Sequence, residues 1–180
     1  EAGLLGARAP CLSAKHFSSL KMTRPSANPQ NSQYMLNALA RWSQSYQVPV
    51  TMPKVFPVHS LLASRSAIAA AQLGHESKAA LAVLSAYWGE GQDISQPEVL
   101  TAVFNKAGLD GAGILAKAQE QTVKDQLKHY TEDALARGVF GAPTMFVGDE
   151  LSGGNVRLVI PRRVLLGARN ACDGPSRRVP

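Results

Sequence analysis

The candidate site in this sequence is the pair Ala142-Pro143, which stands directly ahead of the strand-like run Thr144–Val147. Proline lacks the N–H that a strand uses for pairing, so it is found at the first residue of a strand, on an edge strand or at a bulge. The small residue before it leaves room for a close approach, and an X-Pro bond is where a cis peptide costs least. Two interpretations remain open: a loop that only ends the preceding helix, or backbone groups that are kept available for a ligand.

The other residues with chemical potential do not form a site by their spacing. Four histidines have no ligand-spaced companions, and we expect them to be surface or capping residues: His16, His59, His75 and His129. Asp149-Glu150 is expected to make a turn. Four aromatic residues fall on helical faces and are expected to lie in the core: Trp42, Tyr46, Tyr87 and Trp88.

The cysteines and the charges exclude several classes of function. Cys11 and Cys172 form no Cys-x-x-Cys pair, which argues for a reducing compartment and against dithiol chemistry.

The net charge of +6 is concentrated at the ends of the chain. Residues 76–150 hold 6 basic and 11 acidic residues, a net of 6 − 11 = −5, whereas residues 151–180 hold 6 arginines and 1 acid. The basic tail lacks interleaved aromatic residues, so we expect no nucleic-acid partner. No apolar run reaches the roughly 18 residues that span a membrane.

The elements that must position Ala142-Pro143 are helices. Apolar residues recur at helical spacing from Ser32 to Tyr46, and the residues before Pro49 and Pro53 end this helix. We expect further helices over about 59–73, 76–88, 95–107, 110–118 and 122–137. Leu73 is expected to face inward in the second helix, and alanines such as Ala79 to allow close packing in the third.

Local signals mark the helix ends and the hairpin. Ser95-Gln96-Pro97-Glu98 reads as a capping box, with Ser95 as the N-cap and Glu98 reaching back. Gly108 and Gly138 are expected to end helices. After Pro143 we expect one strand, a turn at Gly148-Asp149 and a second strand from Leu151.

Four segments stand together in a recognisable order. They are FPVHSLLASR (56–65), AYWGEGQDI (86–94), AGLD (107–110) and ARGVFGAPTMFVGDEL (136–151). In this order they resemble the 2-hydroxychromene-2-carboxylate isomerase and kappa-class glutathione transferase family, over about residues 25–155. The resemblance implies a mostly α chain with a small β part: a thioredoxin-like (α/β) fold with a large helical insertion.

The resemblance also implies a domain plan in which the thioredoxin-like part is incomplete. The plan has a divergent N-terminal segment (1–30), a helical insertion domain (31–137), a C-terminal thioredoxin-like part with the hairpin (138–160) and a divergent basic tail (161–180). Without a first strand, Thr144–Val147 would be an exposed hydrophobic edge. The hairpin would then dock on the helices, recruit another chain or aggregate.

A glutathione site is the main functional implication of the resemblance. In such proteins the proline before the strand is cis, and the backbone of the preceding residue pairs with the cysteinyl part of glutathione, here Ala142 beside Pro143. A helix start after the hairpin holds the γ-glutamyl end, which corresponds to Asn155 and Val156. Asn155 can cap a helix, whereas Val156 replaces an acid and cannot pair with an ammonium group.

The sequence departs from the family at further points. The serine that activates the glutathione thiol has no counterpart before Pro25, so the catalytic residue is unknown. Asn31 replaces a lysine, which removes a contact to an anionic substrate. One hypothesis is that both ends are out-of-frame coding sequence, and resequencing that finds one intact frame shared with relatives would reject it.

The function expected from the resemblance is that of a glutathione-dependent isomerase or transferase, with glutathione as cofactor. The glutathione thiolate would add to an aromatic organic acid or an electrophile. The alternative is a catalytically inactive helical module that binds or oligomerises, and a third interpretation is a relative of the disulfide oxidoreductases. We expect a homodimer in the cytoplasm, with a mitochondrial or peroxisomal matrix as the alternative.

Overall fold

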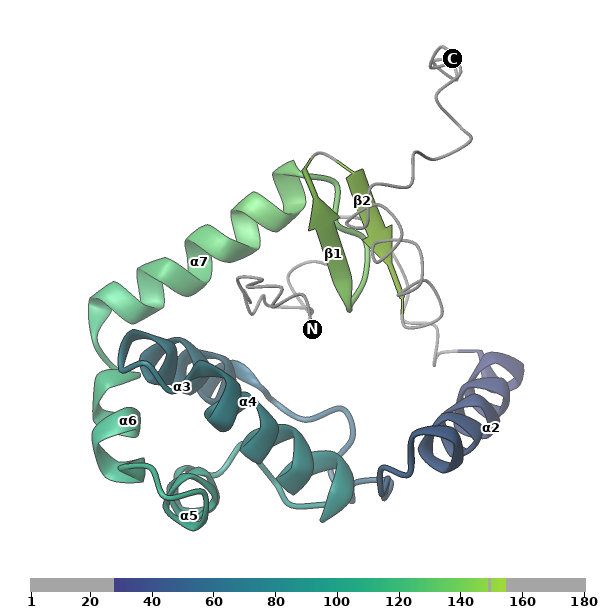
Figure 1. Cartoon of the computed structure of the whole chain (residues 1–180), viewed down its shortest axis with the longest axis horizontal. Coiled ribbons are helices and arrows are strands. Elements are labelled where there is room, and N and C mark those ends of the chain that lie inside the picture. The colour runs from purple at the N-terminus through teal and green to yellow at the C-terminus, as the bar shows by residue number, and fades with distance from the viewer. Residues whose placement is uncertain (1–27, 149, 155–180) are drawn as a thin grey trace, which may run out of the picture. The chain divides into compact units, whose positions relative to one another are not determined.

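The computed structural model describes residues 28–148 and 150–154. The chain divides into two compact units, Glu1–Ala134 and Leu135–Pro180, and each is described by itself. The described residues are mostly helical and contain one two-stranded sheet (Figure 1). This agrees with the expected class, a mostly α chain with a small β part.

Helix α2 (Pro29–Tyr46) begins the described part of the first unit. The Asn28 side chain caps it by accepting hydrogen bonds from the N–H groups of Gln30 (2.9 Å) and Asn31 (3.4 Å). No residue of α2 is buried within the described part of the chain. Trp42 and Tyr46 stack with 5.2 Å between ring centroids, but neither is buried, so the expectation that they lie in the core is wrong for this part of the chain.

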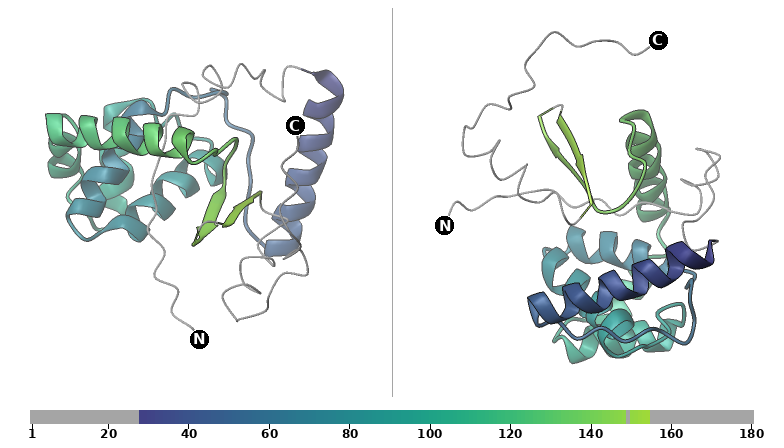
Figure 2. Two further views of the ribbon diagram at one scale, coloured as in Figure 1. Left: turned by 90° about the horizontal axis from the view of Figure 1, so that it is seen from above. Right: turned by 90° about the vertical axis from the view of Figure 1, so that its right-hand side faces the viewer.

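The core of the first unit is formed by helices that follow α2. They are α3 (Leu61–Gln72), α4 (Glu76–Leu84), α5 (Pro97–Lys106), α6 (Gly111–Lys117) and α7 (Gln121–Ala136). The teal helices α3 to α6 lie against one another in both views of Figure 2. The largest fully buried side chains include Phe104, Ile68 and Leu100.

Alanine and leucine positions show how closely α3 and α4 approach each other. Ala69, Ala70 and Ala79 are completely buried, as expected for a small-residue contact between helices. Leu73 was expected to face inward, but it is 47% exposed. The reason is that α3 ends at Gln72, so Leu73 is the C-cap residue and has left the buried face.

The helix expected over 76–88 is interrupted. After α4 the chain forms a π-helix, η2 (Ser85–Gly89), which widens the turn and buries Tyr87. The Tyr87 hydroxyl donates to the carbonyl of Val55 at 3.1 Å, and Trp88 packs edge-on against Tyr87. The π-helix therefore ties the preceding loop to the bundle.

The expected capping box at Ser95 is wrong. The N-cap of α5 is Gln96, and no side chain caps this helix. The Ser95 hydroxyl instead donates to Asp93 Oδ1 at 2.6 Å, and the Ser95 N–H donates to the same oxygen at 3.0 Å. Asp93 and Ser95 therefore form a hydrogen-bonded turn ahead of α5.

The second unit contains the end of α7 and a hairpin of β1 (Thr144–Val147) and β2 (Glu150–Gly153). The strands are antiparallel, with Thr144 opposite Gly153 and Val147 opposite Glu150. Gly138 has φ +75°, the left-handed conformation that favours glycine after a helix, as expected. Within this unit, the guanidinium of Arg137 lies 3.6 Å from the centroid of the Phe146 ring.

Candidate functional site

Ala142 and Pro143 lie in a short loop between α7 and β1, and both are exposed. The bond between them is cis, as the resemblance implies. The loop is held at both ends: the Thr144 hydroxyl donates to the Gly141 carbonyl at 2.6 Å, and the Gly154 N–H donates to the Pro143 carbonyl at 2.9 Å. These two hydrogen bonds fix the backbone on either side of Ala142.

The backbone of Ala142 itself is open. Within residues 28–148 and 150–154, no hydrogen bond reaches its N–H or its carbonyl oxygen. Both groups stand immediately before a strand, at an exposed residue. An N–H and a C=O presented in this way can pair with an extended peptide, as an added strand does.

The carbonyl of Pro143 is not open in the same way. Its hydrogen bond with Gly154 closes the end of the hairpin, where Thr144 faces Gly153. The loop therefore offers a ligand the backbone of Ala142 rather than that of both residues.

Two of the expected binding residues, Asn155 and Val156, lie outside the described residues. The segment before Pro25, where the activating serine was sought, lies outside them as well. Within the described chain, no cluster of three or more metal-ligating side chains is present. His59, His75 and His129 are exposed.

Thr144 and Gly154 support the loop in a way that was not predicted from the sequence. The signal for Thr144 was present, because threonine hydroxyls commonly bond to nearby backbone carbonyls at turns. The signal for Gly154 was the glycine itself, because glycine readily adopts a positive φ. In the structure its φ is +85°, a conformation that L side chains rarely adopt.

Two ionisable groups of the first unit have shifted pKa values. Burial raises the pKa of Tyr87, with the negative charge of Asp93 adding to the rise and the backbone of Val58 opposing it. The pKa of Asp93 is lowered because its carboxylate accepts hydrogen bonds from the Ser95 hydroxyl, the Ser95 N–H and the Gln96 amide. The Tyr87 hydroxyl is bonded to the Val55 carbonyl, and Asp93 is bonded to Ser95 and Gln96, so both groups hold loops of the first unit in place.

No helix in the described ranges is both long enough and apolar enough to cross a membrane.

Comparison with known proteins shows the family to which the chain is similar. A family model described as "DSBA-like thioredoxin domain" matches residues 12–160, so the similarity begins earlier than the expected start near 25. A 2-hydroxychromene-2-carboxylate isomerase from Pseudomonas putida is 32% identical over 128 residues, 69% of this chain and 61% of that protein. Human glutathione S-transferase kappa 1 is 32% identical over 129 residues, 66% of this chain and 57% of that protein.

A solved structure shows the same fold. The structure of a 2-hydroxychromene-2-carboxylate isomerase matches with a TM-score of 0.79 at 23% identity, covering 88% of this chain and 78% of that one. The chain spans about three fifths of the length of the curated relatives it matches. With a matched range of 12–160 and the loop ahead of β1 in place, the chain belongs to the DSBA-like thioredoxin domain family.

Proposed function

We propose that this chain acts in a glutathione-dependent isomerase or transferase of the 2-hydroxychromene-2-carboxylate isomerase type. Relatives that carry the names of that isomerase and of glutathione S-transferase kappa support the reaction class. The observation that carries the proposal is the open backbone of Ala142 ahead of β1, because a tripeptide has the complementary N–H and C=O groups. The second substrate is a small aromatic organic acid or an electrophile.

The residues of this chain fit glutathione at its peptide backbone. The Ala142 N–H would donate one hydrogen bond to glutathione, and the Ala142 carbonyl would accept one. The Thr144–Gly141 and Gly154–Pro143 hydrogen bonds would hold the loop in shape. When bound, glutathione supplies a thiol whose thiolate is the nucleophile. Asn155 and Val156 are proposed to lie at the γ-glutamyl end. Since valine cannot pair with an ammonium group, we expect weaker binding there than an acid would give.

A glutathione titration tests the proposal. The chain is heated with and without millimolar glutathione, and the midpoint of unfolding is compared. A ligand at 100 times its Kd stabilises the folded state by about 2.7 kcal/mol, so specific binding raises the midpoint. S-methylglutathione is expected to stabilise too, because the proposed contact is with the peptide backbone. No shift with either compound would contradict the proposal.

A second candidate is a catalytically inactive helical module that forms a homodimer, and the surface of α2 favours it. Four apolar residues of this helix are exposed within the described chain: Tyr34 (68%), Met35 (47%), Leu36 (44%) and Tyr46 (53%). Exposed apolar surface of this kind is typical of interaction sites. We propose that a second copy of this chain covers it.

Light scattering during gel filtration separates the two candidates, together with the glutathione titration. A dimer that Met35→Glu converts to a monomer, with no glutathione binding, would favour the module. Glutathione binding by the wild-type chain would favour the enzyme. We propose a cytoplasmic location, with an organelle matrix as the alternative, on the basis of the two widely separated cysteines.

A further inference from the structure

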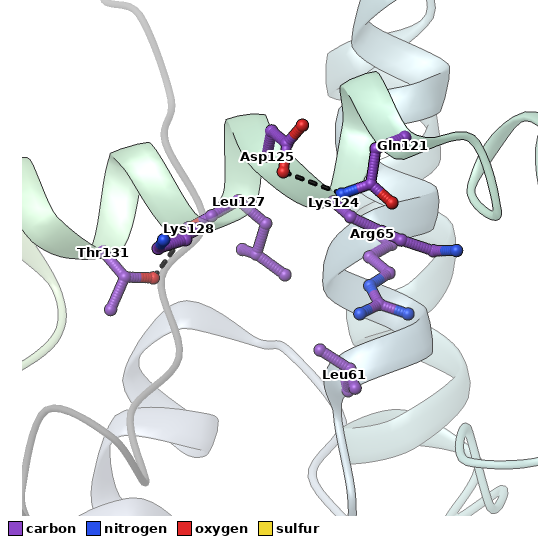
Figure 3. A pocket seen from close by; sticks show the side chains of 8 residues that line it. All are labelled: Leu61, Arg65, Gln121, Lys124, Asp125, Leu127, Lys128 and Thr131. Atoms are coloured by element: carbon purple, nitrogen blue, oxygen red, sulfur yellow. Dashed lines mark hydrogen bonds between the residues drawn. The ribbon is translucent and has the colours of Figure 1, made fainter.

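The first unit contains a cationic pocket between α3 and α7 that the proposed function does not use. It has a volume of about 320 Å³ and eight lining residues: Leu61, Arg65, Gln121, Lys124, Asp125, Leu127, Lys128 and Thr131. Figure 3 shows Leu61 and Arg65 on α3 and the other side chains on α7. We call it the α3/α7 pocket.

Arg65 is a half-buried cation of the pocket. Its Nε is shielded from solvent and has no hydrogen-bond partner. A buried donor of a charged group without a partner is costly, and such groups in native proteins call for an explanation. Because the side chain lines a pocket, a ligand acceptor is a direct way to satisfy this N–H.

Two lysines add to the positive charge of Arg65. Lys124 and Lys128 lie one turn apart on α7, so their side chains emerge on the same face. Within the described chain, no ion pair joins Arg65 or Lys124 to an acid, and Lys128 makes only a 4.0 Å contact with Glu132. The positive charge of the pocket is therefore little neutralised by the protein itself.

Asp125 is the acidic residue of the lining. Its Oδ1 accepts a hydrogen bond from Gln121 Nε2 at 2.9 Å, which Figure 3 shows as a dashed line. With three cations and one carboxylate the lining has a formal charge of 3 − 1 = +2. A dianion neutralises that charge, whereas a monocarboxylate leaves half of it.

The volume and the apolar residues narrow the ligand class further. Pockets for small organic ligands begin at about 300 Å³. The volume of the α3/α7 pocket is therefore large enough for an anion that carries a small organic group. Leu61 and Leu127 supply apolar contact, and Leu127 is 2% exposed. A phosphate monoester carries close to two negative charges at neutral pH, and its oxygens match the forked donors of arginine.

We propose that the α3/α7 pocket binds a small phosphate monoester with an apolar organic group. The phosphate lies against Arg65, Lys124 and Lys128, and the organic group lies against Leu61 and Leu127. This site is separate in chemistry from the backbone site at Ala142, and it does not depend on glutathione binding.

Calorimetric titration of the full chain tests the proposal, with phenyl phosphate, inorganic phosphate and benzoate as probes. Phenyl phosphate is expected to bind most tightly, because only it has both the dianion and the apolar group. Its affinity is expected to fall with added salt, since part of the attraction is between charges near the surface. No binding of phenyl phosphate at millimolar concentration would overturn the proposal, and inorganic phosphate binding equally well would overturn the role of the leucines.

Substitutions in the pocket locate the binding. Lys124→Gln is expected to weaken phenyl phosphate binding about tenfold, the usual size of a lost hydrogen bond to a charged group. Asp125→Asn is expected to strengthen it several-fold, because a repulsive charge is removed while the oxygen that Gln121 contacts is kept. A structural disturbance would not strengthen binding, so these two opposite changes identify an electrostatic site.

Lys106→Gln is the matched control for Lys128→Gln. Both lysines are exposed (72% and 66%) and both face a glutamate, but Lys106 lies on α5, away from the pocket. Lys128→Gln is expected to weaken binding and Lys106→Gln to leave it unchanged. Arg65→Gln is expected to abolish binding. If that variant does not fold, Lys124→Gln and Asp125→Asn decide the question, and wild-type affinity in both would overturn the proposal.

Discussion

The N–H of Gly154 donates to the carbonyl oxygen of Pro143 at 2.9 Å, so the end of the hairpin is closed by a residue beyond β2. This bond occupies the acceptor of Pro143 and leaves the backbone of Ala142, one residue earlier, exposed ahead of the strand. The proposed contact with the cysteinyl part of glutathione therefore uses the backbone N–H and carbonyl of Ala142, and the carbonyl of Pro143 is already bonded within the hairpin.

Ala142→Pro tests whether the Ala142 N–H donates a hydrogen bond to glutathione. Proline removes the N–H at position 142, and the loss of one hydrogen bond to the ligand is expected to weaken glutathione binding about tenfold. Ala142→Ser is the control, because it changes the same exposed side chain and keeps the N–H. Affinities are measured by calorimetry after both variants are shown to unfold cooperatively. Wild-type affinity in a folded Ala142→Pro chain would mean that this N–H is not used.

Thr144→Val tests whether the loop must be held in shape. The substitution removes the hydroxyl that donates to Gly141 at 2.6 Å and keeps the size and branching of the side chain. Glutathione affinity is expected to fall several-fold, because the loop that presents Ala142 loses one of its two supports. Thr144→Ser keeps the hydroxyl and is expected to restore binding. Equal affinities in the valine and serine variants would show that the hydrogen bond does not matter for the ligand.

Gly111→Ala tests the close approach of α6 to α5. A Cβ at this position would lie 2.5 Å from the Thr101 carbonyl oxygen and 2.9 Å from Asn105 Oδ1. Relief of such a clash requires the backbone to move, which costs about 1 to 3 kcal/mol of unfolding free energy. At Gly89 the added Cβ would be 3.8 Å from the nearest atom, so Gly89→Ala is the control and is expected to be close to neutral. Urea denaturation of both variants measures the difference, and equal stability would contradict the close packing.

The hydrogen-bonded carboxylate of Asp93 is expected to make the folded chain less stable in acid. Its pKa in the folded chain lies below the ordinary value of 3.8, because Ser95 and Gln96 donate to its carboxylate. The stabilisation is present above pH 3.8 and is lost as the pH falls through the lower, folded-state value. Asp93→Asn keeps an acceptor for Ser95 but does not titrate. The unfolding midpoint of the wild-type chain is therefore expected to fall more steeply than that of the variant below pH 3.8. Parallel curves would show that the turn does not depend on the charge.

The helices could be predicted closely from the sequence because their ends are marked by local signals. Pro97 and Gly108 bracket α5, and Gly138 follows α7 with the positive φ that its type suggests. Two predictions are wrong because each used only a short stretch of sequence. The four residues from Ser95 predict an N-cap, but the Ser95 hydroxyl donates to Asp93. The pattern over 76–88 predicts a regular helix, but residues 85–89 form a π-helix in which Tyr87 is buried. A buried aromatic ring or an upstream acceptor overrides a short pattern.

The α3/α7 pocket could not be predicted from the sequence, because its cations come from helices that are far apart in the chain. Lys124 and Lys128 have the spacing of one helical face, but such pairs are usually solvated, and nothing in the sequence joins them to Arg65. By contrast, the site at Ala142 was found because proline ahead of a strand is a local signal. The same signal could not show that the Pro143 carbonyl is taken by Gly154.

The measurement that tests the central claim most directly is amide exchange at Ala142, followed by nuclear magnetic resonance with and without glutathione. An N–H that is exposed and unpaired in the free chain exchanges quickly, and one that donates to a bound peptide is protected. We predict that glutathione slows the exchange of the Ala142 amide more than that of the Phe146 amide in β1. If glutathione leaves the Ala142 amide unchanged at a concentration that saturates the chain, the backbone site is wrong.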